Sequence, residues 1–86
     1  MIIKTPLKAQ VRWQCRRGML ELDILLLSFF ETHYDALRLE EQAAFCRLLE
    51  ASDPDIHAWL TAELLAPDLE LQNLVSLMQK NRKDKG

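Results

Sequence analysis

The chain has 86 residues, about half of them hydrophobic, with 11 basic and 13 acidic side chains and a net charge of −2. This length fits one domain, and an acidic balance speaks against nucleic-acid binding, which usually requires an excess or a stripe of basic residues. No apolar run approaches the ~20 residues that span a bilayer, and two cysteines are too few for a disulfide framework. We therefore expect a soluble protein with reduced thiols and no membrane insertion.

The sequence shows no strand signal, neither sustained alternation nor an Asn-Gly or Asp-Gly turn. It predicts an all-α fold, a bundle of five short helices in a single domain of residues 1–86. Residues 1–7 are expected to form a flexible N-terminus and residues 82–86 a flexible basic tail. The first helix is predicted over about Lys8–Cys15, with Val11 and Trp13 as its apolar contacts.

The second helix is predicted to begin after Gly18. Its apolar side chains recur at the spacing of one helical face, which comprises Leu22, Leu25, Leu26, Phe29 and Phe30. Ile24 and Leu27 widen that face further. We therefore expect this helix to be the buried centre of the bundle.

The third helix is predicted over about Leu39–Glu50, with Glu40 and Glu41 in the first turn, where the helix dipole favours negative charge. Arg38 is a poor N-cap, so the start of this helix is weakly specified. Its apolar stripe consists of Phe45, Leu48 and Leu49.

The last two helices are each predicted to open with a proline at the first helical position. Asp53 is expected to cap the fourth helix ahead of Pro54, and Ile56, Trp59 and Leu60 to face inward. The fifth opens at "APDLE" and is expected to fray from Lys80 onward. Its stripe consists of Leu71, Leu74, Val75 and Met78, and the bundle interior is expected to hold Trp59, Phe29, Phe30 and Phe45.

The charges are segregated along the chain. Residues 1–20 hold five basic side chains and no acid, and residues 21–70 hold twelve acids against Arg38 and Arg47. A solvated surface with charged ends is one interpretation, and a protein partner with matching charges is the other.

The sequence offers no pattern for catalysis or for metal binding. Cys15, Cys46, His33 and His57 do not have the close ligand pairs of a zinc site. There is no glycine-rich phosphate loop and no spacing that indicates a nucleophile with its base. We expect a binding protein rather than an enzyme, with no metal and no cofactor of its own.

The stretch "CRRGMLELD" places a rare glycine between basic and acidic side chains. Gly18 can end the first helix at positive φ, or it can cap the second helix with Glu21 reaching back as half of a capping box. Arg16 and Arg17 would then complement the dipole of the first helix. The other interpretation is a docking patch, in which Gly18 allows close approach of a partner and Met19 points outward as a soft apolar contact.

This stretch resembles the signature of a known family. Arg17-Gly18-Met19-Leu20-Glu21 matches the Arg-Gly-x-x-Glu motif of the SdhE-type FAD assembly factors of bacteria, and "FCRLLEASDPDIHAWL" is similar to their second recurrent stretch. The resemblance covers about Val11 to Arg82. One departure is "TAELLAPD", where family members often have a glycine just after the tryptophan helix, so the turn there is expected to differ.

The resemblance implies a five-helix factor that binds the flavoprotein subunit of succinate dehydrogenase, with the flavoprotein subunit of fumarate reductase as a second candidate partner. It implies that the factor promotes covalent attachment of the partner's FAD to a histidine of that subunit. The partner-binding residues would be Arg17, Gly18, Met19, Glu21 and Asp23.

The resemblance also bears on where and in what form the protein acts. It implies a bacterial cytoplasmic protein, because only sixteen residues precede Arg17 and a mitochondrial relative would need a presequence. We expect a monomer when the protein is free. Two other functions stay open: an antitoxin-like soluble partner of a small membrane toxin, a role also ascribed to this family, and an acidic helical regulator.

Overall fold

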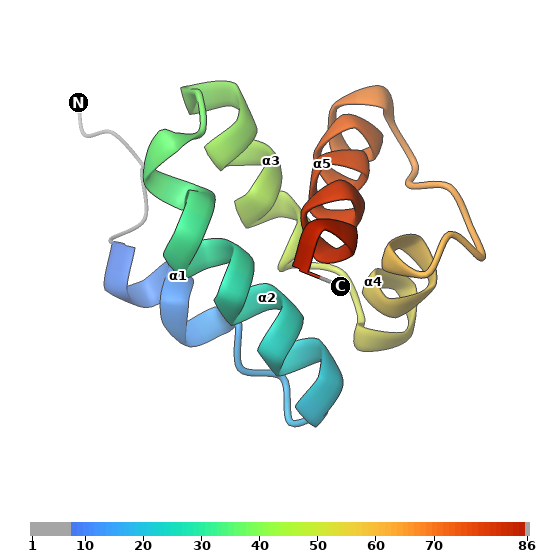
Figure 1. Cartoon of the computed structure of the whole chain (residues 1–86), viewed down its shortest axis with the longest axis horizontal. Helices are drawn as coiled ribbons and strands as arrows, with labels where there is room; N and C mark the ends of the chain where they lie inside the picture. The colour runs from blue at the N-terminus through green and yellow to red at the C-terminus, as the bar shows by residue number, and fades with distance from the viewer. Residues whose placement is uncertain (1–7, 86) are drawn as a thin grey trace.

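The protein is described by a computed structural model that covers residues 8–85, with side chains for residues 8–80. In that range the elements are α1 (Lys8–Gln14), α2 (Leu20–His33), the 3-10 turn η1 (Tyr34–Ala36), α3 (Leu39–Leu48), α4 (Asp53–Leu60) and α5 (Leu69–Lys85), without a strand (Figure 1). The predicted all-α fold is confirmed. The expectation of a flexible N-terminus falls on residues outside this range, and so do the side chains of the expected basic tail.

Both proline-containing helix starts differ from the prediction by one or two positions. The N-cap of α4 is Ser52, whose hydroxyl accepts a hydrogen bond from the Asp55 N–H at 3.3 Å. The prediction that Asp53 caps α4 was therefore wrong, and Pro54 stands second in the helix. Pro67 does not occupy the first position of α5 either, because α5 begins at Leu69 and the Asp68 carboxylate accepts from the Leu71 N–H at 2.9 Å.

The remaining helix ends are set by local hydrogen bonds. α3 starts after Arg38, whose N–H donates to the Glu41 carboxylate at 2.8 Å, so Glu41 supplies the capping that the Arg38 side chain cannot. α3 ends at Leu48, two residues earlier than predicted. The backbone of α5 stays helical to Lys85, so this helix continues beyond the predicted end at Lys80.

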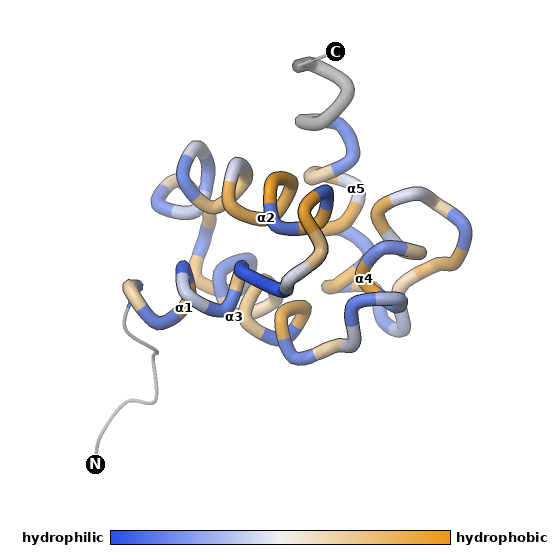
Figure 2. Tube along the Cα trace, turned by 90° about the horizontal axis from the view of Figure 1, so that it is seen from below, coloured by the Kyte–Doolittle hydropathy of each residue, from blue (hydrophilic) through white to orange (hydrophobic). Residues whose placement is uncertain are grey.

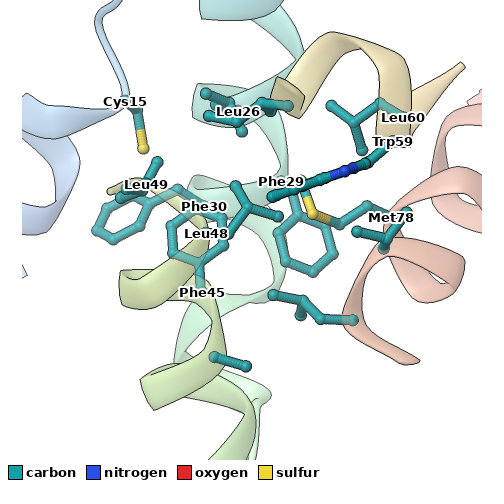
Figure 3. Close-up of a cluster of buried hydrophobic side chains, with 14 of the residues drawn as sticks. Cys15, Leu26, Phe29, Phe30, Phe45, Leu48, Leu49, Trp59, Leu60 and Met78 are labelled. Carbon is teal, nitrogen blue, oxygen red and sulfur yellow. The ribbon is translucent and has the colours of Figure 1, made fainter. Parts of the chain in front are cut away.

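The core is an apolar cluster to which every helix contributes (Figure 3). The four aromatic residues predicted for the interior are all buried: Phe29, Phe30, Phe45 and Trp59. The Phe29 and Phe45 rings lie 5.8 Å apart between centroids and join α2 to α3. Large rings that interlock in this way fill a small core densely, which lets a short chain form a stable bundle.

Two predictions about burial were wrong. Trp13 is exposed, because it lies on the side of α1 opposite Val11, which is fully buried. α2 is not buried all round, because Ile24 and Leu20 are exposed on the side away from the core. α2 is therefore an amphipathic helix whose outer side carries aliphatic residues.

Candidate functional site

The α1–α2 connection, residues 15–19, contains the Arg-Gly motif and runs along the lower edge of the molecule in Figure 1. Gly18 has φ = +90°, which confirms the expected positive φ. It lies four residues beyond the end of α1, and the N-cap of α2 is Met19. Gly18 thus caps neither helix, and Glu21 stands second in α2 rather than third, where a capping box needs it.

The side chain of Arg17 points into the protein and is 16% exposed. Its Nε donates at 2.8 Å to Oδ1 of Asp53, which is the first residue of α4. Nη1 donates to the carbonyl of Gln14 at 3.0 Å and to that of Leu49 at 2.8 Å, and Nη2 donates to the carbonyl of Ala51 at 2.8 Å. One guanidinium therefore joins the end of α1, the α3–α4 connection and the start of α4.

Electrostatics favours this arrangement of Arg17. The carbonyls of Gln14 and Leu49 lie at the C-terminal ends of α1 and α3, where the helix dipoles carry partial negative charge. The planar guanidinium has five N–H donors in a fixed fork, so it can serve several acceptors at once, as a lysine cannot.

Asp23, two residues beyond the motif, also holds this loop. Its carboxylate accepts a hydrogen bond from the backbone N–H of Arg17, which closes the loop from the first turn of α2. Arg17 and Asp23 together fix the backbone on both sides of Gly18. These hydrogen bonds hold the loop against the end of α1 and the start of α2.

Three of the five residues predicted to bind a partner are exposed: Gly18, Met19 and Glu21. A Cβ built on Gly18 meets no atom within 4 Å, so the space beside this backbone is open to solvent. The Glu21 carboxylate lies 3.6 Å from His57 Nε2, so α4 also borders this surface. We call Gly18, Met19 and Glu21 the docking edge.

Sequence reasoning missed two features of this region. Nothing in the local spacing indicates that Arg17 turns inward, because its acceptors beyond Gln14 lie more than thirty residues away. The exposure of Leu20 and Ile24 could have been predicted from the sequence, since both lie outside the helical face defined by Leu22 and Leu26.

The cysteine and histidine side chains considered as metal ligands are buried or contact other side chains. Burial raises the pKa of the Cys15 thiol to about 12, which leaves it protonated at neutral pH. Cys46 Sγ lies 4.0 Å from the Tyr34 hydroxyl, and the His33 ring stacks on Phe29 at 5.1 Å. Across residues 8–80, no three histidine, cysteine or acidic side chains gather as a metal ion would require.

The part of the chain that the structure describes contains no helix with both the length and the apolar content needed to cross a membrane.

Comparison with known proteins gives consistent matches over nearly the whole chain. A family model described as flavinator of succinate dehydrogenase matches residues 9–82. Two proteins named FAD assembly factor SdhE, from Pectobacterium atrosepticum and Yersinia pseudotuberculosis, are 46% and 48% identical over 79 residues, covering 92% of this chain and 90% of each relative. The solution structure of a UPF0350 protein superposes with a TM-score of 0.77 at 41% identity, covering 91% of this chain and 83% of that one.

Proposed function

The chain belongs to the family of succinate dehydrogenase flavinators, and we propose that it is an FAD assembly factor without catalytic residues of its own. Its partner is the flavoprotein subunit of succinate dehydrogenase, and the flavoprotein subunit of fumarate reductase is the second candidate partner. It promotes covalent attachment of the partner's FAD to a histidine of that subunit. The proposal also assigns it to the bacterial cytoplasm and assigns FAD to the partner.

The observation that carries this proposal is the exposed backbone at Gly18, next to residues that hydrogen bonds hold from inside. Arg17 and Asp23 hold the loop from inside, and the position beside the Gly18 Cα is empty. A surface that is already ordered loses little conformational entropy on binding. The docking edge therefore suits close approach by another protein's backbone, and the exposed Glu21 carboxylate lies at its side.

The factor would act by binding rather than by chemistry. Histidyl flavinylation needs the acceptor imidazole held against the flavin ring, and a pocket that stabilises negative charge on that ring. The flavoprotein can supply both groups. A factor that binds the competent arrangement more tightly than the alternatives increases its population and leaves afterwards. The Cys15 thiol fits this role, because it is buried, protonated and unsuited to be a nucleophile.

The test is in-gel flavin fluorescence of the flavoprotein subunit, expressed with the wild-type factor, without it, or with a variant. Covalent flavin is expected to rise with the wild-type factor. Gly18→Asn is the informative variant, because asparagine tolerates positive φ better than other side chains while its amide fills the open space beside the loop. We expect this variant to fold and to lose flavinylation.

Two outcomes contradict the proposal. One is equal flavin fluorescence with and without the wild-type factor. The other is full activity of folded Gly18→Asn and Glu21→Gln variants at limiting concentration. Co-purification of a membrane peptide or of DNA in place of the flavoprotein would favour the antitoxin or regulator function instead.

A further inference from the structure

The first two turns of α2 carry two aliphatic side chains on the side away from the core. Leu20 is 75% exposed and Ile24 is 57% exposed. They are four residues apart and so lie one above the other. Glu31, seven residues beyond Ile24, falls on the same side and accepts a hydrogen bond from Arg12 of α1 at 2.7 Å. α1 therefore reaches this side of α2 at Glu31, while Leu20 and Ile24 at its start stay exposed.

A cation lies in the connection that leads into this stripe, four residues before Leu20. Within residues 8–80, Arg16 is the arginine that has no carboxylate within 4 Å, and its guanidinium lies 5.8 Å from the centroid of the exposed Trp13 ring. Figure 2 shows a strongly hydrophilic stretch in the connection that leads into α2. An exposed arginine and an exposed tryptophan thus precede the aliphatic stripe in the chain, and arginine and aromatic residues are enriched at interface centres.

We propose that Leu20 and Ile24, preceded in the chain by Arg16, form a second contact with the flavoprotein subunit and supply most of the binding affinity. The partner surface is then apolar, with a carboxylate at its edge. One observation selects this occupant. Leu20 lies between Met19 and Glu21 in the chain, so a protein seated on the docking edge covers it as well. Arg16, which has no acidic partner within the described residues, would then pair with the carboxylate expected on the flavoprotein.

This inference rests on the proposed function and assigns different roles to the docking edge and to the aliphatic stripe. The docking edge fixes how the flavoprotein is placed, since a glycine backbone and one carboxylate bury little apolar area. The aliphatic stripe supplies the burial that makes the complex long-lived.

The experiment is isothermal titration of the purified flavoprotein subunit with the full-length factor and with a Leu20→Ser, Ile24→Ser double variant. We expect about 100-fold weaker binding, roughly tenfold for each lost aliphatic contact, and a less negative heat capacity of binding. The matched control is Leu65→Ser, Leu64→Ser, at positions 79% and 58% exposed in the α4–α5 connection. That connection lies at the right edge of Figure 1, away from the α1–α2 connection, and its variant is expected to bind like the wild type.

The outcomes separate this inference from the proposed function. If Gly18→Asn loses binding while Leu20→Ser, Ile24→Ser binds as tightly as the wild type, the proposed function stands and the stripe has no role. If both serine double variants weaken binding equally, the affinity does not reside at α2 and the inference is overturned. If the wild-type factor itself does not bind, the proposed function fails first. Arg16→Gln is expected to reduce the salt dependence of association, and an unchanged salt dependence would contradict the acidic border.

Discussion

Replacing Arg17 by alanine is expected to destabilise the fold, although the residue belongs to a motif implicated in partner binding. The substitution removes four N–H···O contacts of 2.8–3.0 Å. It also leaves Asp53 and the carbonyls of Leu49 and Ala51 without this donor in a region where the arginine side chain is 16% exposed. Removing one member of a buried charged pair typically costs ~3–5 kcal/mol. Because this pair retains some solvent contact, we expect about 3 kcal/mol, which corresponds to a fall in melting temperature of roughly 12–24 °C.

Urea unfolding followed by circular dichroism measures this cost. Arg16→Ala is the matched control, since Arg16 is exposed and lies 5.8 Å over the Trp13 ring, and its loss should cost less than about 1 kcal/mol. If Arg17→Ala does not fold, Arg17→Lys tests the same point, because a lysine ammonium cannot reach all four acceptors and should recover only part of the stability. An Arg17→Ala protein that unfolds within about 1 kcal/mol of the wild type would refute the inward role. Any loss of flavinylation in that variant would then reflect direct contact with the partner.

Two further predictions concern residues outside the motif. Ala62 has φ = 68° where α4 ends, and the Ala62 and Glu63 N–H groups donate back to the carbonyls of Trp59 and Ala58. Ala62→Gly should relieve the left-handed strain and stabilise the protein by up to about 1 kcal/mol in urea unfolding, and a destabilised variant would show that the turn holds no strain. The second prediction is that burial, which raises the pKa of the Cys15 thiol to about 12, slows its reaction with iodoacetamide at pH 8 until the protein unfolds. The folded state also favours the protonated thiol, so Cys15 contributes to the free energy of unfolding. This contribution is complete below the ordinary pKa of 9.0 and is lost as the pH rises toward 12. Its loss amounts to about 1.4 kcal/mol per pH unit, a slope that Cys15→Ala should remove. Rapid labelling of the native thiol would contradict this.

The helices and the core could be predicted from the sequence because both follow from local spacing. Phe29, Phe45 and Trp59 lie on apolar stripes of period 3.6, and each is buried. Trp13 was misplaced although the helical spacing excludes it, because residues two apart on a helix lie on opposite sides and Val11 is the buried one. The left-handed Ala62 was expected only as a changed turn, since alanine gives no signal of positive φ where glycine would.

The motif could be located from the sequence, but the division of roles within it could not. A resemblance marks Arg17, Gly18 and Glu21 together, without distinguishing a residue that touches the partner from one that holds the loop. That distinction depends on acceptors more than thirty residues away, in the α3–α4 connection and at Asp53. Such contacts have no periodicity and leave no trace in the sequence around the arginine.

The position of Asp53 shows how one long-range contact also changes a local prediction. Ser52 and Asp53 are both good helix caps, so local preference alone cannot choose between them. In the folded protein Asp53 Oδ1 accepts from Arg17 Nε at 2.8 Å, which occupies the carboxylate, and Ser52 takes the capping position with its hydroxyl toward the Asp55 N–H. The guanidinium that fixes the Gly18 loop is thus bonded to the first residue of α4, the helix that brings His57 to 3.6 Å from Glu21. The docking edge and its α4 border are therefore held by the same side chain, so we expect Arg17 to support partner binding without touching the partner.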